Sequence, residues 1–81
     1  MKKRYEDGVV PKNSAKIRMD MARQLKAARL EQNLTQQVLA ERAGTRKSNI
    51  SRMESGSYNP TLDFLVKIAE SMGKKISIHM E

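Results

Sequence analysis

Cysteine is absent from the 81 residues, and the only aromatic side chains are Tyr5, Tyr58 and Phe64. Without cysteine the chain has no disulfide, zinc finger or catalytic thiol, which fits a reducing cytoplasm. The shortage of aromatic residues argues against RNA-binding modules that stack bases on aromatic rings. No apolar run is long enough to cross a bilayer, and no apolar stretch follows the basic N-terminus. We therefore expect a cytoplasmic protein without membrane contact.

Residues that catalyse reactions or bind metals are equally scarce. His79 is the only histidine, and Glu81 is the only carboxylate near it, so the sequence supports neither a metal site nor a catalytic base. No glycine-rich phosphate loop is present, and 81 residues make one small domain without room for a buried catalytic cavity. We expect a protein that is not an enzyme and that uses no metal or cofactor.

Acidic residues are outnumbered by basic ones. The chain has 16 Lys and Arg against 9 Asp and Glu, a net charge of +7. A basic domain of this size favours a polyanionic partner, and nucleic acid is the most common one. The alternative is that the charge only keeps the protein soluble, although acidic residues usually serve that purpose better.

Residues 1–14 are predicted to form an N-terminal arm. Asp7-Gly8 is a turn signal, Pro11 interrupts helix, and Asn13-Ser14 can cap the helix that follows. Two interpretations are open: a basic arm that touches DNA, or a solvated tail.

A first helix is expected from Ser14 or Ala15 to Gln32. An apolar stripe recurs at helical spacing, formed by Ile17, Met21, Leu25 and Ala28. The opposite face is assigned to Arg18, Arg23 and Lys26. Leu30 is off the stripe, so it is either exposed or in contact with another subunit.

Two short helices joined by a tight turn are predicted between residues 34 and 56. Thr35 caps the first, which ends near Ala43, and Gly44 supplies the left-handed turn. The second runs from about Arg46 to Ser55, with Ile50 and Met53 as its buried anchors. Between Glu41 and Glu54 every charged residue is basic: Arg42, Arg46, Lys47 and Arg52. This is the layout of a helix-turn-helix whose second helix enters the DNA major groove.

A fourth helix and a strand are expected to complete the fold. Thr61 caps a helix that ends near Met72, with one apolar face formed by Leu62, Leu65, Ile68, Ala69 and Met72. In residues 74–81 the pattern alternates, which predicts a short β-strand with Ile76, Ile78 and Met80 on one side. Such a strand needs a partner: Val9-Val10, a different protein, or the same strand of a second subunit, which we favour.

The sequence thus predicts an all-α domain of four to five helices over residues 15–73, followed by the short strand. Five short motifs occur in order along it: LTQ from Leu34, LAERAG from Leu39, SNISRMESG from Ser48, NP from Asn59, and IAESMG from Ile68. With these motifs, the segment from Ile17 to Gly73 resembles the phage repressor and Cro family of helix-turn-helix domains, also called the xenobiotic-response-element (XRE) family.

The resemblance implies a helical bundle that binds operator DNA, usually as a dimer. It implies that Gln36 grips a phosphate and braces the recognition helix. It assigns contacts with base edges to Lys47, Ser48 and Arg52. Five further residues match positions at or near the DNA backbone: Thr45, Arg46, Asn49, Tyr58 and Asn59. It also pairs Arg29 with Glu54 in a buried, structural ion pair between the first and third helices.

The chemistry of the third helix agrees with that assignment. Arg and Lys donate to guanine O6 and N7 in the major groove, and Lys47 and Arg52 both avoid the buried stripe. One departure concerns the cap: the family usually has an apolar residue and then Ser where this chain has Thr45 and Arg46. Thr45 is then the candidate cap, and its use would shift the helix start by one residue.

Two functions from different classes follow from these observations. The first is a sequence-specific DNA-binding repressor that reads a near-palindromic operator as a homodimer. The second is an antitoxin that neutralises a toxin protein and also represses its own operon, because small members of the family with an arm and a C-terminal strand look like antitoxins. A bridging factor or RNA binder is disfavoured by the basic recognition helix and the lack of an aromatic platform.

Overall fold

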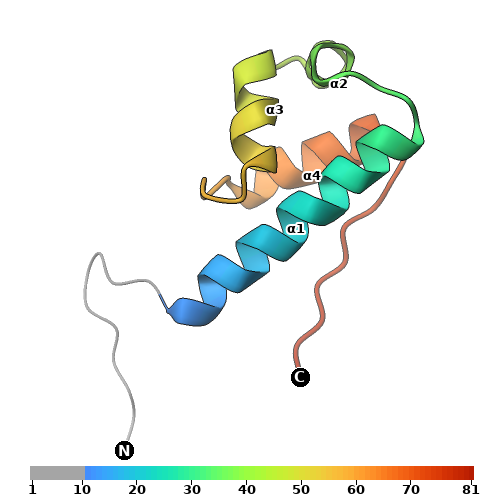
Figure 1. Cartoon of the computed structure of the whole chain (residues 1–81). Coiled ribbons are helices and arrows are strands. Elements are labelled where there is room, and N and C mark those ends of the chain that lie inside the picture. Colours follow the sequence, from blue (N-terminus) through green and yellow to red (C-terminus); the bar gives the residue numbers. More distant parts are fainter. Residues whose placement is uncertain (1–10) are drawn as a thin grey trace, which may run out of the picture.

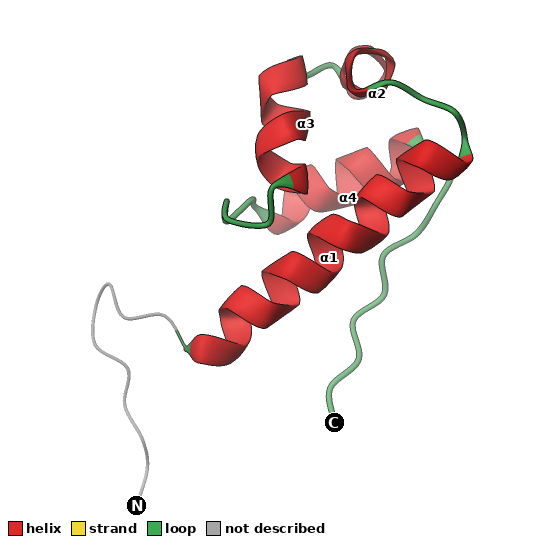
Figure 2. Ribbon diagram, in the orientation of Figure 1, coloured by secondary structure: helices red, strands yellow, loops and turns green. Residues whose placement is uncertain are grey.

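Residues 11–81 form four α-helices: α1 (Lys12–Glu31), α2 (Gln36–Ala43), α3 (Lys47–Glu54) and α4 (Leu62–Ser71). The computed structural model describes residues 11–81, and this part of the chain contains no β-strand (Figure 2). Helices α2 and α3 lie at one end of the molecule, above the long α1, and α4 runs in roughly the same direction as α1 (Figure 1). The all-α prediction with four to five helices is confirmed.

The core lies where the apolar faces of the helices meet. Leu39 of α2, Ile50 of α3 and Ile68 of α4 are fully buried. Helix α2 packs against both α3 and α4, while α1 packs against α3. Burying a side chain of this size stabilises the fold by about 1.5–3 kcal/mol. The helices are therefore held by a single shared core rather than by their individual propensities.

Hydroxyl side chains begin two of the helices, as the sequence predicts. Thr35 Oγ1 accepts a hydrogen bond from the Val38 N–H at 3.0 Å, and Thr61 Oγ1 accepts one from the Phe64 N–H at 3.1 Å. Gly44 ends α2 in the left-handed conformation, with φ of 67°. The two threonines fix where the chain enters α2 and α4, and Gly44 fixes where it leaves α2 and turns toward α3.

Helix α1 starts earlier than expected. It begins at Lys12, and Pro11 precedes it with φ of −59° and a carbonyl that accepts the Ser14 N–H at 3.0 Å. Asn13 and Ser14, the predicted caps, therefore lie inside the helix and not before it. No side chain caps this end. Proline favours this position because its φ is already fixed near the required value. The rest of the proposed arm, residues 1–10, lies outside the described residues.

Most of the predicted stripe of α1 faces the core. Leu25 is buried and Met21 and Ala28 pack against the core, whereas Ile17 is 53% exposed. Ala22 and Arg29 are buried as well, and the periodicity of apolar residues alone does not reveal the burial of Arg29. Leu62, expected on the inner face of α4, is 55% exposed in the first turn of that helix.

The predicted C-terminal strand does not form in the described chain. Residues 74–81 run as an extended segment back along α1 (Figure 1), and nothing within residues 11–81 pairs with their backbone as a strand. Ile76 packs partly against the core, while Ile78 and Met80 are 75% and 89% exposed. Alternation gives a chain strand character, but a ladder needs a second strand. The candidate partner Val9-Val10 lies outside the described residues.

None of the helices in residues 11–81 has both the length and the hydropathy that crossing a membrane requires.

Candidate nucleic-acid interface

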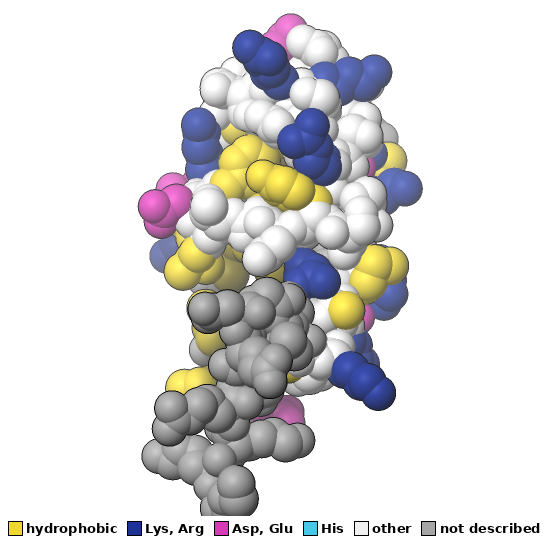
Figure 3. Space-filling model, turned by 90° about the vertical axis from the view of Figure 1, so that its left-hand side faces the viewer, with side chains coloured by type: hydrophobic (Ala, Val, Ile, Leu, Met, Phe, Trp, Pro, Cys, Tyr) yellow, Lys and Arg dark blue, Asp and Glu magenta, His cyan; other side chains and the backbone are white. Residues whose placement is uncertain are grey.

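Helix α3 presents a polar face to solvent. Ile50 and Met53 are 0% and 2% exposed and attach the helix to the core. The remaining outward positions are exposed and polar or basic: Lys47, Ser48, Ser51 and Arg52. Figure 3 views the molecule from the side on which α3 lies, and Lys and Arg side chains are spread over this face while acidic ones lie at its margins. Such a face suits contact with a polyanion.

The predicted site residues come from three consecutive parts of the chain: the start of α2, α3 with the turn before it, and the turn after it. Six of them are exposed: Arg46, Lys47, Ser48, Arg52, Tyr58 and Asn59. Three are half-buried: Gln36, Thr45 and Asn49. The fold therefore leaves most of the set accessible, and the half-buried members make contacts within the protein.

The start of α3 differs from the expected cap. Arg46 occupies the capping position with φ of −96° and ψ of 149°, and no side chain accepts a hydrogen bond from the first turn. Thr45 does not cap the helix, because its Oγ1 accepts a hydrogen bond from Asn49 Nδ2 at 2.9 Å. The first backbone N–H groups of α3 thus have no side-chain acceptor, an arrangement that favours an anion there.

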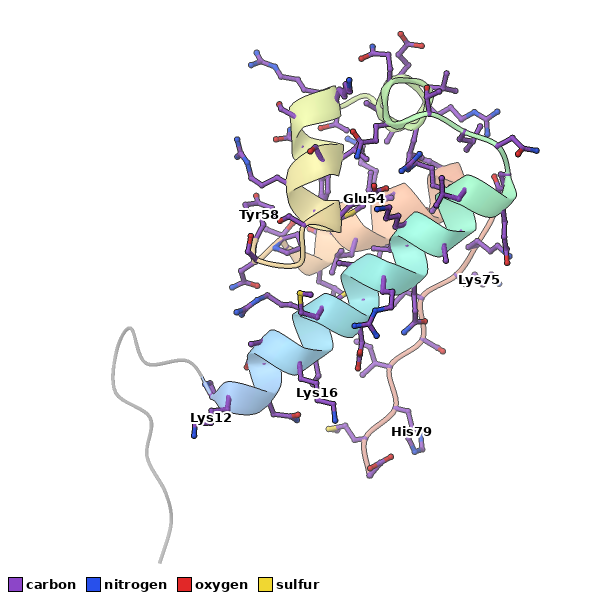
Figure 4. The ribbon with its side chains drawn as sticks, in the orientation of Figure 1. Lys12, Lys16, Glu54, Tyr58, Lys75 and His79 are labelled. Atoms are coloured by element: carbon purple, nitrogen blue, oxygen red, sulfur yellow. The ribbon has the colours of Figure 1, made fainter. Side chains whose placement is uncertain are left out.

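A buried ion pair fixes α3 against α1. Arg29 Nε and Nη2 donate to the two carboxylate oxygens of Glu54 at 2.7 and 3.0 Å, and Nη1 donates to the Leu34 carbonyl at 2.8 Å. The two side chains are 9% and 4% exposed. The hydrogen bonds that Arg29 donates to the Glu54 carboxylate raise the pKa of Arg29 above its usual value, against the opposing effect of burial. Figure 4 shows Glu54 on the side of α3 that faces α1.

Gln36 joins the same network. Its Nε2 donates to Glu54 Oε1 at 3.1 Å, so one carboxylate ties together α1, α2 and α3. This gives a physical basis for the bracing role that the resemblance implies for Gln36. Its contact with a phosphate stays a prediction.

Two contacts near the end of α3 were not anticipated from the sequence. The Arg52 guanidinium carbon lies 5.7 Å from the centre of the Tyr58 ring, a cation–π arrangement. The intervening Gly56 has φ of 77°, and Met19 of α1 packs against it so closely that a Cβ would collide with its sulfur. Glycine at a turn signals a left-handed conformation, but neither partner can be inferred from spacing.

The family of the chain follows from comparison with known proteins. A family model described as helix-turn-helix (HTH_3) matches residues 25–78. An uncharacterized HTH-type transcriptional regulator of Archaeoglobus fulgidus is 41% identical over 56 residues, covering 69% of this chain and 79% of that protein. The immunity repressor protein of Bacillus phage phi105 is 37% identical over 59 residues, which are 73% of this chain but 41% of the repressor.

Solved structures agree with these relatives. An HTH_3 family transcriptional regulator from Vibrio cholerae superimposes with a TM-score of 0.72 and 27% identity, over 76% of this chain and 35% of that one. A chain of a toxin–antitoxin module from Streptococcus pneumoniae gives a TM-score of 0.68 and 28% identity, over 91% of this chain and 85% of that one. The chain belongs to the HTH_3, or XRE-type, helix-turn-helix family of DNA-binding transcriptional regulators.

Proposed function

We propose that the protein is a sequence-specific transcriptional repressor that places α3 in the major groove of a near-palindromic operator. The observation that carries the proposal is the exposed polar face of α3 on a helix locked in place by the buried Arg29–Glu54–Gln36 network. A recognition helix must be rigid, because a small displacement moves its side chains away from the base edges. The similarity to a phage immunity repressor supports repression as the outcome.

Each residue of the face has a proposed role. Lys47 and Ser48 lie at the first turn of α3 and reach base edges, and Arg52 reads a base near the other end of the helix. The Tyr58 ring holds the Arg52 guanidinium at the edge of the groove. Contacts with phosphates are proposed for Gln36, Thr45, Arg46, Asn49, Tyr58 and Asn59.

A dimer is part of the proposal. Two recognition helices presented about one helical turn of DNA apart, roughly 34–36 Å, read the two halves of a palindrome. The segment that carries Ile76, Ile78 and Met80 is proposed as the dimer or partner contact, because two of these side chains are largely exposed. Pairing about a two-fold axis would also satisfy its free backbone groups.

Fluorescence anisotropy with the DNA upstream of the protein's own gene tests this function. We expect tight binding to that duplex, weak binding to a shuffled duplex, and a log–log salt slope of about −0.9 for each phosphate neutralised. Lys47→Ala and Arg52→Ala should each weaken specific binding by about 1–3 kcal/mol. Lys67→Ala, an exposed α4 charge, is the matched control. Equal weak binding of both duplexes would contradict the proposal.

Neutralisation of a toxin is the second candidate function. The observation that favours it is the similarity to a chain of a toxin–antitoxin module over 91% of this protein and 85% of that chain, which leaves little outside the match. Co-expression with the protein encoded by the adjacent gene is the test. We expect a stable complex and relief of growth arrest; a gene without a small neighbour, or a neighbour that does not arrest growth, would argue against it.

A further inference from the structure

Arg18 occupies an unexpected position on α1. It lies four residues before Ala22, seven before Leu25 and eleven before Arg29, the three buried residues of this helix. At about 100° per residue, these spacings put Arg18 on the same face as all three. The sequence pattern predicted that Arg18 lies on the exposed face with Arg23 and Lys26, and the structure shows that this prediction is wrong for Arg18. The chain has an arginine where a continued buried stripe would have an apolar residue.

The surroundings of Arg18 leave one of its donors without a partner. The residue is half-buried, and its Nε is shielded from solvent but forms no hydrogen bond with any of residues 11–81. On the same face, each of the three guanidinium nitrogens of Arg29 donates a hydrogen bond, two to the Glu54 carboxylate and one to the Leu34 carbonyl. An unpartnered buried donor costs free energy. Rotation of this half-buried side chain toward an acceptor outside residues 11–81 would remove that cost.

The position of Arg18 indicates what that acceptor is. Its neighbour Met19 packs against Gly56, so the part of α1 that holds Arg18 lies beside the turn that follows α3 and carries Tyr58. The N-terminal half of α1 extends past the end of α3 on the same side of the molecule as that helix (Figure 1). The nearby Asp20 carboxylate is engaged by Arg23 at 3.3 Å and projects from a different face of α1.

We propose that Arg18 binds a phosphate of the DNA backbone that flanks the base pairs read by α3. A guanidinium is planar and donates in a fork that matches phosphate oxygens, which suits a position where residues 11–81 supply no acceptor to the Arg18 Nε. Arg18 precedes residues 25–78, the part of the chain that the family model matches. The contact therefore lengthens the footprint of the helix-turn-helix along α1. It rests on the proposed DNA-binding function.

Arg18→Gln tests the proposal through the salt dependence of binding. Loss of one phosphate contact should reduce the steepness of the log–log slope by about 0.9 and weaken binding roughly tenfold at 0.1 M salt. The loss should be the same for the upstream and the shuffled duplex, because a phosphate carries no sequence. Thermal unfolding of the variant should be unchanged, since the side chain makes no hydrogen bond through its buried nitrogen.

Lys16→Gln is the matched control. The substitution removes the same charge as Arg18→Gln, two residues away. The Lys16 side chain projects from nearly the opposite face of α1, away from Tyr58 (Figure 4). This variant should leave the slope close to that of the unmodified chain. An equal loss in both variants would show a general field effect and overturn the specific site. An unchanged slope with lowered thermal stability would assign Arg18 a purely structural role and also overturn it.

Neutral methylphosphonates placed one at a time in the flanking DNA locate the contact. At one position, the substitution should weaken binding of the unmodified protein and of Arg18→Lys, but not add to the loss in Arg18→Gln. Additive losses at every position would reject the site. If the unmodified protein binds duplex DNA with a steep salt slope and Arg18→Gln binds with the same slope and affinity, the Arg18 site is rejected and the proposed DNA-binding function still holds. If it binds no duplex, the proposed function fails with it.

Discussion

Arg29 carries a charge whose partner, Glu54, is buried with it: the two side chains are 9% and 4% exposed. Its desolvation is offset because each of its donor groups has an acceptor, two on Glu54 and one on the backbone. Glu54→Ala would leave this charge buried and uncompensated. We expect the free energy of unfolding to fall by about 3–5 kcal/mol, measured by urea denaturation. That is a large share of the 5–15 kcal/mol typical of a small domain.

The exposed pair between Asp20 and Arg23 is the control for that experiment. Its side chains are 48% and 72% exposed, so Asp20→Ala should cost at most about 1 kcal/mol. The double variant Arg29→Met with Glu54→Leu should recover much of the stability, because no charge is then left unpaired. A Glu54→Ala variant as stable as the parent would show that the pair contributes nothing to holding α3.

Gly56 and Gly44 offer a second comparison between single residues. Both have positive φ, 77° and 67°, so an alanine at either position should cost about 1–2 kcal/mol in backbone strain. Only at Gly56 does the new Cβ collide with Met19, whereas nothing lies within 4 Å at Gly44. Gly56→Ala should therefore lower the melting temperature more than Gly44→Ala. Adding Met19→Ala should reduce the difference in melting temperature between the two glycine variants. Equal losses of melting temperature in Gly56→Ala and Gly44→Ala would contradict the role of the Met19 contact.

Helix α3, the proposed recognition helix, begins without a side-chain cap. Arg46 has the extended backbone that capping residues adopt, but its side chain accepts no hydrogen bond. Arg46→Ser should raise the free energy of unfolding by about 0.5–2 kcal/mol. Because Arg46 is also a proposed phosphate contact, the same variant should bind DNA more weakly. Thermal unfolding and anisotropy measured together would show the opposite changes; a parallel change would reject one of the two roles.

The sequence predicts the helices better than it predicts the contacts between them. Thr35, Gly44 and Thr61 are local signals, so the existence and approximate limits of α2 and α4 follow from neighbouring residues. The burial of Arg29 does not follow from neighbouring residues, because it depends on Glu54, 25 residues away, and only the family resemblance paired the two. The stacking of Arg52 on Tyr58 likewise depends on the path of the turn through Gly56. The predicted strand over residues 74–81 does not form within residues 11–81, because alternation specifies a face but not a partner.

At the scale of the whole described molecule, residues 11–81, α3 and the C-terminal segment lie on different sides of α1 (Figure 1). The side that carries α3 is basic and polar. On the other side, Ile17 and Ile78 border the groove between α1 and the C-terminal segment. Both are more than half exposed, at 53% and 75%. This separation would let a second copy bind without covering the face proposed for DNA.

The double variant Ile78→Ser with Met80→Ser tests that arrangement. These side chains are 75% and 89% exposed, so their loss should leave the stability of the folded chain nearly unchanged. If they form the dimer contact, sedimentation velocity should show weaker association, and affinity should fall for a two-half-site operator but not for a single half-site. Ile76→Ser, at a position packed against the core, should instead destabilise the fold. Unchanged dimerisation of the double variant would place the interface elsewhere, because a surface that holds two copies together cannot lose its largest apolar groups without weakening.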